Sequence, residues 1–179
     1  PAHTEIVIEG LIDPLVPPEA PKEFFSALDR DVARLGGTVR VLLTTPDHGR
    51  SSAQFVARYD AQLWAPTRDH TPANTDATPV WLEGHASILP AGRPDEVIYW
   101  LAEHRTLVVG NVLRGSDRSG AATAASLRVA EIPNLDWEAV LDRILDLDVE
   151  RILPARGRPV LENAGDELRS LASQTSPRR

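Results

Sequence analysis

The sequence contains no cysteine and no methionine, and it has no long apolar run. Without cysteine the chain can hold no disulfide, no thiolate zinc site and no cysteine nucleophile. Its apolar runs fall well short of the ~20 residues that a membrane-spanning helix needs, and its start has no signal-peptide pattern. The last two absences predict a cytoplasmic protein that has no membrane partner.

Short catalytic motifs are missing as well. The sequence contains no Gly-x-Ser-x-Gly nucleophile elbow, no P-loop and no Rossmann glycine fingerprint. It therefore carries no local sign of a serine hydrolase of that kind, of a P-loop nucleotide hydrolase or of a Rossmann dinucleotide enzyme.

The charge balance is acidic, with 26 aspartates and glutamates against 19 lysines and arginines. A net charge of −7 and a pI near 5.2 argue against nucleic acid or an anionic membrane as the main partner. The hydrophobic content of 42% is ordinary for a globular protein, and 179 residues suffice for one domain with a sizeable core. We therefore expect a single domain over residues 1–179, with residues 173–179 frayed.

Strand and helix patterns alternate in the first third of the chain. Strands are predicted at residues 5–8, 11–14, 38–44 and 62–65. A helix that ends at Gly36-Gly37 carries an apolar stripe formed by Phe24, Leu28, Val32 and Leu35. A shorter helix over residues 51–59 is expected to turn Phe55 and Val56 inward. Because the strand at 38–44 is almost continuously apolar, it resembles a parallel strand buried on both faces of an α/β sheet.

The rest of the chain predicts an antiparallel meander and closing helices. Short strands are expected at residues 80–82, 86–89, 97–101, 106–109, 127–132 and 151–154. The turn Glu103-His104-Arg105 suggests a hairpin. Asp136 or Asn134 can cap a helix, and the apolar stripe of this helix is Trp137, Val140, Leu141, Ile144 and Leu147. A last helix is predicted at 162–172, and loops are predicted at 67–79 and 116–125.

A polar loop follows the strand at 38–44. The residues Thr44-Thr45-Pro46-Asp47-His48-Gly49-Arg50 place an acid, a histidine and an arginine at the carboxyl end of that strand. Open α/β sheets build their sites in loops of this kind. Asp47 and His48 could equally cap the helix that is expected to begin near Ser51. Both interpretations stay open.

Several blocks, taken in order, resemble the metallo-β-lactamase fold superfamily. The blocks are residues 10–14, 42–48, 59–66, 91–101, 103–113 and 152–160. The most specific is 103–113, which looks like the hairpin that delivers the Gly-Asp pair of the family. The resemblance implies an α/β fold of the αββα four-layer sandwich type, with the N-terminal strands missing or shortened.

The resemblance also implies where the metal ligands would fall in the first loop. The His-x-His-x-Asp-His motif can be aligned in two registers. Without gaps its four ligands fall on Thr45, Asp47, Gly49 and Arg50. When the motif is aligned on the following helix, Asp47 and His48 take its last two positions. The second register is preferred because it keeps the next helix and strand in step.

The other family ligands are replaced. The histidine of the Gly-His-Thr block falls on Gly92 or Arg93, the bridging aspartate on Asn111, and the last histidine on Arg156. A zinc hydrolase needs several imidazole and carboxylate ligands and an open position for water. Arg156 would instead bring a permanent positive charge to the place of the dication.

These substitutions favour a metal-free protein that is not an enzyme, with a degenerate site and no cofactor. We expect it to bind a small anionic ligand or to act as a regulatory binding protein. The site residues implied by the family loops are Asp47, His48, Arg50, Arg93, Asn111 and Arg156. Because arginine suits carboxylates and phosphates, the arginines among them would hold the anion.

Two alternatives remain. The first is a metal-dependent hydrolase with a mononuclear site, in which Asp47, His48 and Asn111 would bind a divalent metal such as zinc and Arg156 would stabilise an oxyanion. The second is an interaction protein with a filled pocket, which leaves a homo-oligomer open. Its anchors would be tryptophans, namely Trp64, Trp81, Trp100 and Trp137.

Overall fold

The computed structural model describes residues 5–9, 22–36, 38–66, 82–116, 127–133 and 135–175. The strand predicted at 11–14, the loop at 67–79 and all but Ser116 of the loop at 116–125 lie outside these residues. Among the described residues no helix has the length and apolar character needed to cross a membrane.

The first sheet is parallel and contains β1 (Glu5–Glu9), β2 (Val39–Leu43) and β3 (Gln62–Trp64) in that order. Helix α1 (Lys22–Leu35) lies between β1 and β2 in the chain, and its end is marked by the left-handed Gly36 with φ of +66°. After β2 come the 3-10 helix η1 (Pro46–Ser51) and helix α2 (Ser52–Tyr59). The predicted strand–helix alternation is thus present in this part of the chain.

The second sheet has the order β4 (Ser87–Pro90), β5 (Val97–Leu101), β6 (Thr106–Val109) and β9 (Arg151–Pro154). Strands β4, β5 and β6 are antiparallel neighbours, and β6 and β9 are parallel. The predicted hairpin joins β5 to β6 through η4 (Ala102–His104). Arg105 closes this turn in the left-handed conformation, with φ of 48°.

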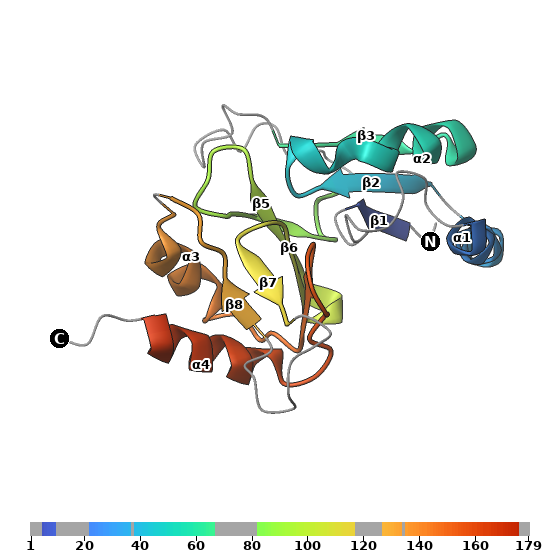
Figure 1. Cartoon of the computed structure of the whole chain (residues 1–179). Helices are drawn as coiled ribbons and strands as arrows, with labels where there is room; N and C mark the ends of the chain where they lie inside the picture. Colours follow the sequence, from blue (N-terminus) through green and yellow to red (C-terminus); the bar gives the residue numbers. More distant parts are fainter. Residues whose placement is uncertain are drawn as a thin grey trace.

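A third, two-stranded sheet pairs β7 (Leu113–Gly115) with β8 (Leu127–Val129). Helices α3 (Trp137–Ile144) and α4 (Ala164–Thr175) follow in the chain. Asp136 caps α3 as one of the two predicted cap residues, because its carboxylate accepts the amide of Ala139 at 3.0 Å. The helices α1 and α2 lie at one side of the molecule, and α3 and α4 lie at the other (Figure 1).

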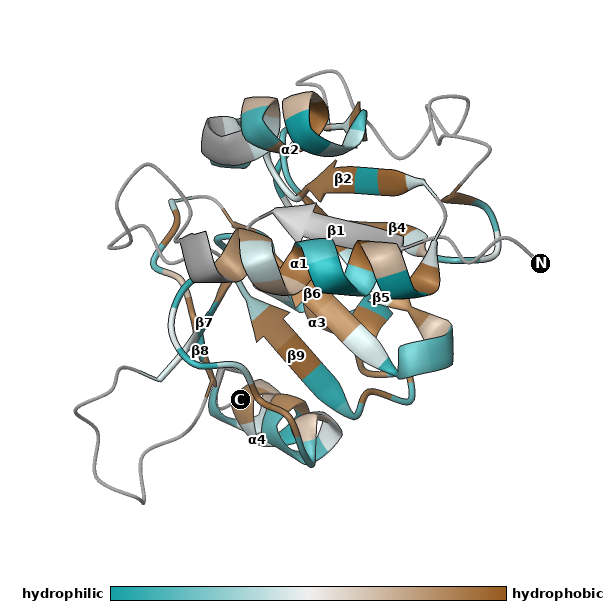
Figure 2. Cartoon of the chain, turned by 90° about the vertical axis from the view of Figure 1, so that its right-hand side faces the viewer, coloured by the Kyte–Doolittle hydropathy of each residue, from teal (hydrophilic) through white to brown (hydrophobic). Residues whose placement is uncertain are grey.

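Three apolar clusters define the layers. Val41 and Leu43 of β2 pack with Phe55 of α2 and Phe25 of α1 on the outer face of the first sheet. Leu42, on the other face of β2, packs between the two sheets. The outer face of the second sheet contacts α3 and α4 in the largest cluster. The layer order is therefore αββα, as the resemblance implied, and the strands β2, β6 and β9 are mostly apolar in Figure 2.

A hydrogen bond and an edge-to-face ring contact join the two sheets directly. The buried Tyr99 hydroxyl on β5 donates to the carbonyl of Leu43 on β2 at 2.6 Å. Its ring also meets that of Trp64 on β3, with centroids 6.0 Å apart. Burial of a large apolar side chain stabilises the fold by ~1.5–3 kcal/mol, so this inner layer fixes how the sheets are stacked.

Some predicted details are wrong. Phe24 is 38% exposed, and Phe25 takes the inward position with Leu28 and Val32. Val56 is 40% exposed, because the short helix α2 turns Phe55 inward instead.

The other errors concern element boundaries. Leu82 is buried between the sheets in a turn and not in a strand. Strand β7 was not predicted. Helix α4 continues to Thr175, so the first residues of the segment expected to fray, 173–175, are helical.

Candidate functional site

The loops after β2, before β5 and after β6 meet at one edge of the sandwich. The carbonyl of Thr44, just after β2, accepts the amide of Val97 at the start of β5 at 2.9 Å. Because β5 runs antiparallel to β6, the start of β5 lies beside Gly110, the residue after β6. A Cβ atom on Gly110 would come within 2.8 Å of the Thr44 hydroxyl and would also meet the Glu96 carboxylate.

Glu96 is buried at the centre of this edge, with 2% of its surface exposed. Its Oε1 accepts the backbone amides of Asn111 and of Val112, the latter at 3.1 Å. These bonds tie the loop after β6 to the loop before β5. Burial raises the pKa of Glu96, while the two amides and the Arg93 guanidinium oppose that rise.

Arg93 faces the second oxygen of Glu96. The Nε of Arg93 lies 3.7 Å from Glu96 Oε2, an oxygen that has no hydrogen-bond partner among the described residues. Arg93 also donates to Asp95, at 3.3 Å from Nε and 3.5 Å from the second guanidinium nitrogen. Its charge is thus already met by two carboxylates.

His48 contacts Thr44 and Thr45 at the same edge. Its backbone amide donates to the carbonyl of Thr45 at 3.1 Å, and its Nδ1 lies 3.2 Å from the buried Thr44 hydroxyl. Asp47 is exposed in the first turn of η1. The cap position of η1 is held by Thr45, which makes no side-chain cap bond. The helical turn thus begins before Asp47 and His48, and neither residue is its cap.

Thr44, His48, Arg93, Glu96 and Asn111 form what we call the closed cluster. In the described part of the chain, no group of at least three His, Asp or Glu side chains is placed to hold a metal ion. Glu96 is committed to two amides, and the positive charge of Arg93 lies beside it. This donor set does not fit a divalent metal, which needs several free anionic or imidazole ligands.

Arg156 lies in the loop after β9 and is exposed. It makes no ion pair with any residue that the structure describes, and only its carbonyl is engaged, by the amide of Gly115 at 2.9 Å. Of the predicted site residues, His48, Arg93 and Asn111 therefore belong to the closed cluster, and Arg156 lies in an open loop. The side chain of Arg50 lies outside the described part.

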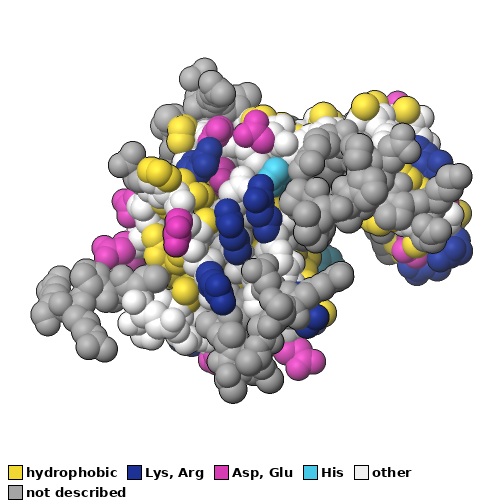
Figure 3. Space-filling model, in the orientation of Figure 1, with side chains coloured by type: hydrophobic (Ala, Val, Ile, Leu, Met, Phe, Trp, Pro, Cys, Tyr) yellow, Lys and Arg dark blue, Asp and Glu magenta, His cyan; other side chains and the backbone are white. Residues whose placement is uncertain are grey.

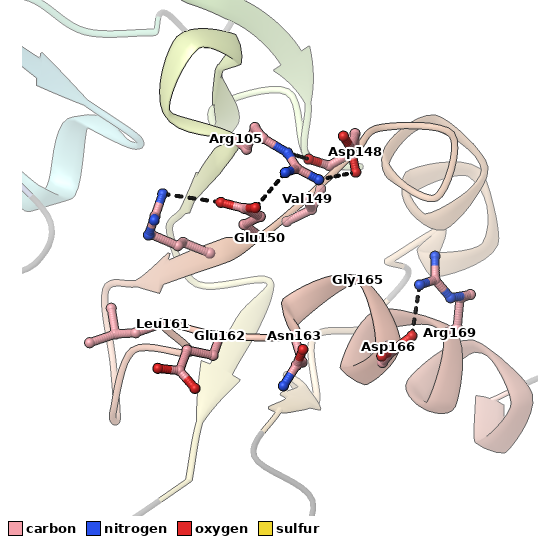
Figure 4. A pocket seen from close by; sticks show the side chains of 11 residues that line it. Arg105, Asp148, Val149, Glu150, Leu161, Glu162, Asn163, Gly165, Asp166 and Arg169 are labelled. Atoms are coloured by element: carbon pink, nitrogen blue, oxygen red, sulfur yellow. Dashed lines mark hydrogen bonds and ion pairs between the residues drawn. The ribbon is translucent and has the colours of Figure 1, made fainter.

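A surface hollow of about 500 Å³ lies elsewhere, between the hairpin turn after β5, the start of β9 and the start of α4 (Figure 4). Apart from Glu162, its charged side chains are paired within its own wall. Arg105 bonds to Asp148 and Glu150, and Arg169 bonds to Asp166 at 2.7 Å. The hydrogen bond to Asp148 is the main reason why the pKa of Arg105 is raised. These pairs stabilise the wall and leave little charge for a ligand.

Sequence reasoning missed Glu96. The signal in the sequence was that Glu96 directly precedes the apolar strand Val97–Leu101. A side chain at that position lies at the edge of the sheet. Because buried carboxylates need hydrogen-bond donors, such a position predicts a structural acceptor. The donors themselves come from residues 111 and 112, across the hairpin.

No family model and no curated protein matches this chain. Among solved structures, it is similar to a metallo-β-lactamase family protein from Thermus thermophilus, with 17% identity over 87% of this chain and 67% of that one and a TM-score of 0.48. It is also similar to the DIM-1 metallo-β-lactamase exposed to ceftazidime, with 18% identity over 84% and 75% and a TM-score of 0.47.

A third similar structure is the FIM-1 metallo-β-lactamase from Pseudomonas aeruginosa in its mono-zinc form. The identity is 16% over 84% of this chain and 62% of that one, with a TM-score of 0.30. The layers of this chain have the αββα order that the resemblance of the sequence implied. The fold of the described residues is an αββα sandwich. Function has to be inferred from the residues of this chain.

Proposed function

We propose that this metallo-β-lactamase-like protein is non-catalytic, that its metal site is degenerate, and that it binds a small anionic ligand at Arg156. The observation that carries the first part is Glu96, whose buried carboxylate bonds to the amides of Asn111 and Val112. At the edge where the family resemblance predicts a metal, the Glu96 side chain is thus hydrogen-bonded to two backbone amides.

The choice of an anion is supported by the different states of the arginines. Arg93 is partly buried and meets Asp95 and Glu96, so its charge is largely cancelled. Arg156 is exposed and has no acidic partner among the described residues. An exposed guanidinium can donate two parallel hydrogen bonds to a carboxylate or a phosphate, and this makes Arg156 the ligand-binding residue of the proposal.

Thermal unfolding with added orthophosphate or succinate tests the proposal. A ligand at about ten times its Kd stabilises a protein by about 1.4 kcal/mol, so the unfolding midpoint of the wild type should rise with concentration. Arg156→Gln should abolish the rise. The matched control is Arg143→Gln, an exposed arginine of α3 without a described ion pair, and it should keep the rise.

Two results would contradict the proposal. One is a midpoint that no anion moves, or that moves equally in Arg156→Gln. The other is stoichiometric zinc, iron or manganese in protein purified without chelators, lost together with a hydrolytic activity when Asp47 or His48 is replaced. That second result would restore the hydrolase alternative.

A further inference from the structure

The third sheet carries an arginine on each of its two strands. In the antiparallel register of β7 and β8, Arg114 lies directly opposite Arg128. Their neighbours Leu113 and Leu127 are buried in the largest apolar cluster. Side chains alternate between the two faces of a strand, so the two arginines lie on the outer face, and both are exposed.

The loop after β9 adds two further arginines beside β7. The carbonyl of Arg156 accepts the amide of Gly115 at 2.9 Å, and the amide of Arg158 donates to the carbonyl of Ser116 at 3.2 Å. Gly157, between them, has φ of +84°. A Cβ atom on Gly157 would lie 2.8 Å from the Cα of Gly115, so the two backbones are in direct contact.

Arg114, Arg128, Arg156 and Arg158 thus come from three neighbouring segments, and we call them the open row. Figure 3 shows dark-blue side chains gathered in a row over the part of this face where β7 and β8 lie. All four are exposed, and none forms an ion pair or side-chain hydrogen bond with any residue in the described ranges.

Such an arrangement is costly without a counterion. Like charges directly opposite each other on an antiparallel pair are destabilising, and adjacent strands are only about 4.8 Å apart. The protein as a whole has a net charge of −7, yet no described acid pairs with any of these four arginines. A bound anion would remove the repulsion.

We infer that the open row binds an oligophosphate, meaning a ligand that carries two or more linked phosphate groups. This inference rests on the proposed function, because it extends the anion site from Arg156 to Arg114, Arg128 and Arg158. Linked phosphates share a bridging oxygen, so their charges follow one another at short intervals. Arginines on adjacent backbone segments can each bind one phosphate of such a chain.

Other anions match the row less well. A single orthophosphate or carboxylate occupies only one or two guanidinium groups. In an extended acidic peptide, carboxylates on one face repeat every second residue, about 6.6 Å apart, which is wider than the strand spacing. A long nucleic acid would extend past the row onto a protein surface with net negative charge, which repels it.

Isothermal titration calorimetry of the whole chain at low salt tests the inference with three probes: tripolyphosphate, orthophosphate and an oligoaspartate peptide. Tripolyphosphate should bind at least about tenfold more tightly than the other two. The double variant Arg114→Gln/Arg128→Gln should lose about tenfold or more of that affinity and little of the orthophosphate affinity. Its unfolding midpoint should not fall, since a repulsive pair has been removed.

The control is Arg34→Gln/Arg143→Gln, which changes the net charge equally at exposed sites on α1 and α3 and should leave all affinities unchanged. The inference is overturned if tripolyphosphate binds no better than orthophosphate, if the control loses as much affinity as the row variant, or if oligoaspartate binds most tightly. In each of these cases, orthophosphate binding that depends on Arg156 would leave the proposed function standing. If no anion binds at all, the proposed function fails as well.

Discussion

The closed cluster and the open row both contain arginines from loops at strand ends, but they differ in burial and in pairing. Arg93 is partly buried and faces the carboxylates of Asp95 and Glu96. Arg156 and its neighbours in the open row are exposed, and no described acid meets them. Arginine serves structure where its charge is already paired, and it is available to a ligand where the protein supplies no counterion.

The charged hollow of Figure 4 extends this comparison. It is a concave surface, yet Arg105 and Arg169 in its wall are each bonded to at least one acid. Concavity alone would select the hollow as the binding site. The lack of an acidic partner selects the open row instead, and the variants below distinguish these two criteria.

The largest expected effect is that of Gly115→Ala. A Cβ atom there would lie 2.6 Å from the backbone nitrogen of Arg158, which cannot yield without breaking its bond to Ser116. Overpacking of this kind costs about 3 kcal/mol and should separate the loop after β9 from β7. We expect the free energy of unfolding in urea to fall by that amount and tripolyphosphate affinity to fall at least about tenfold.

Gly49→Ala is the matched control for this variant. An added Cβ there would meet only the side-chain ends of Leu43 and Ser52, so both stability and binding should change much less. A Gly115→Ala protein with full tripolyphosphate affinity would mean that the open row does not depend on the contact between loop and strand.

Glu96→Ala should give the next largest effect, on stability alone. It leaves the amides of Asn111 and Val112 without their acceptor, and each lost hydrogen bond costs about 0.5–1.5 kcal/mol. Glu96→Gln, which keeps one oxygen acceptor, should lose less. Chemical denaturation measures both. If a folded Glu96→Gln protein no longer bound tripolyphosphate, the closed cluster and the open row would have to be treated as one site.

The pH dependence of stability should report on Glu96. Its pKa in the folded protein is raised above the ordinary value of 4.5, mainly by burial. The favourable contribution of the protonated group is therefore complete below pH 4.5 and is lost as the pH rises through the folded pKa. Relative to the wild type, Glu96→Gln should become more stable over this window. A difference in unfolding free energy that stays constant with pH would contradict the raised pKa.

The smallest effect is expected from Arg105→Gln in the hollow. Arg105 bonds to Asp148 and Glu150 at the surface, where ion pairs contribute little to stability. The unfolding midpoint should fall slightly, and the affinity for tripolyphosphate should stay the same. Loss of binding in this variant, measured by calorimetry, would favour concavity over pairing as the criterion for the site.

Elements with one dominant local cause were predicted well. The strand at 38–44 corresponds to β2, because its almost continuous apolar run can be buried on both faces only when the strand lies between two layers. Helix α3 was predicted because Asp136 caps it and its stripe is regular. In the stripe of α1, Leu28 and Val32 were predicted correctly but Phe24 was not, since the adjacent Phe25 satisfies nearly the same spacing.

The candidate site depends on contacts that no local pattern encodes. Strand β7 is three residues long with Arg114 at its centre, so it shows no run from which a strand could be predicted. Arg114 and Arg128 lie close together because their strands β7 and β8 pair with each other. Glu96 acquires its role from amides 15 and 16 residues further along the chain. Such sites become visible only when the register of the strands is known.

The contact between Gly115 and Gly157 has a consequence for how related sequences can diverge. A methyl group on either residue would meet the backbone of the other segment and not its side chain. A second substitution at the opposite position cannot make room for that methyl group, so no compensating mutation is available there. Descendants that keep the row should therefore retain both glycines independently.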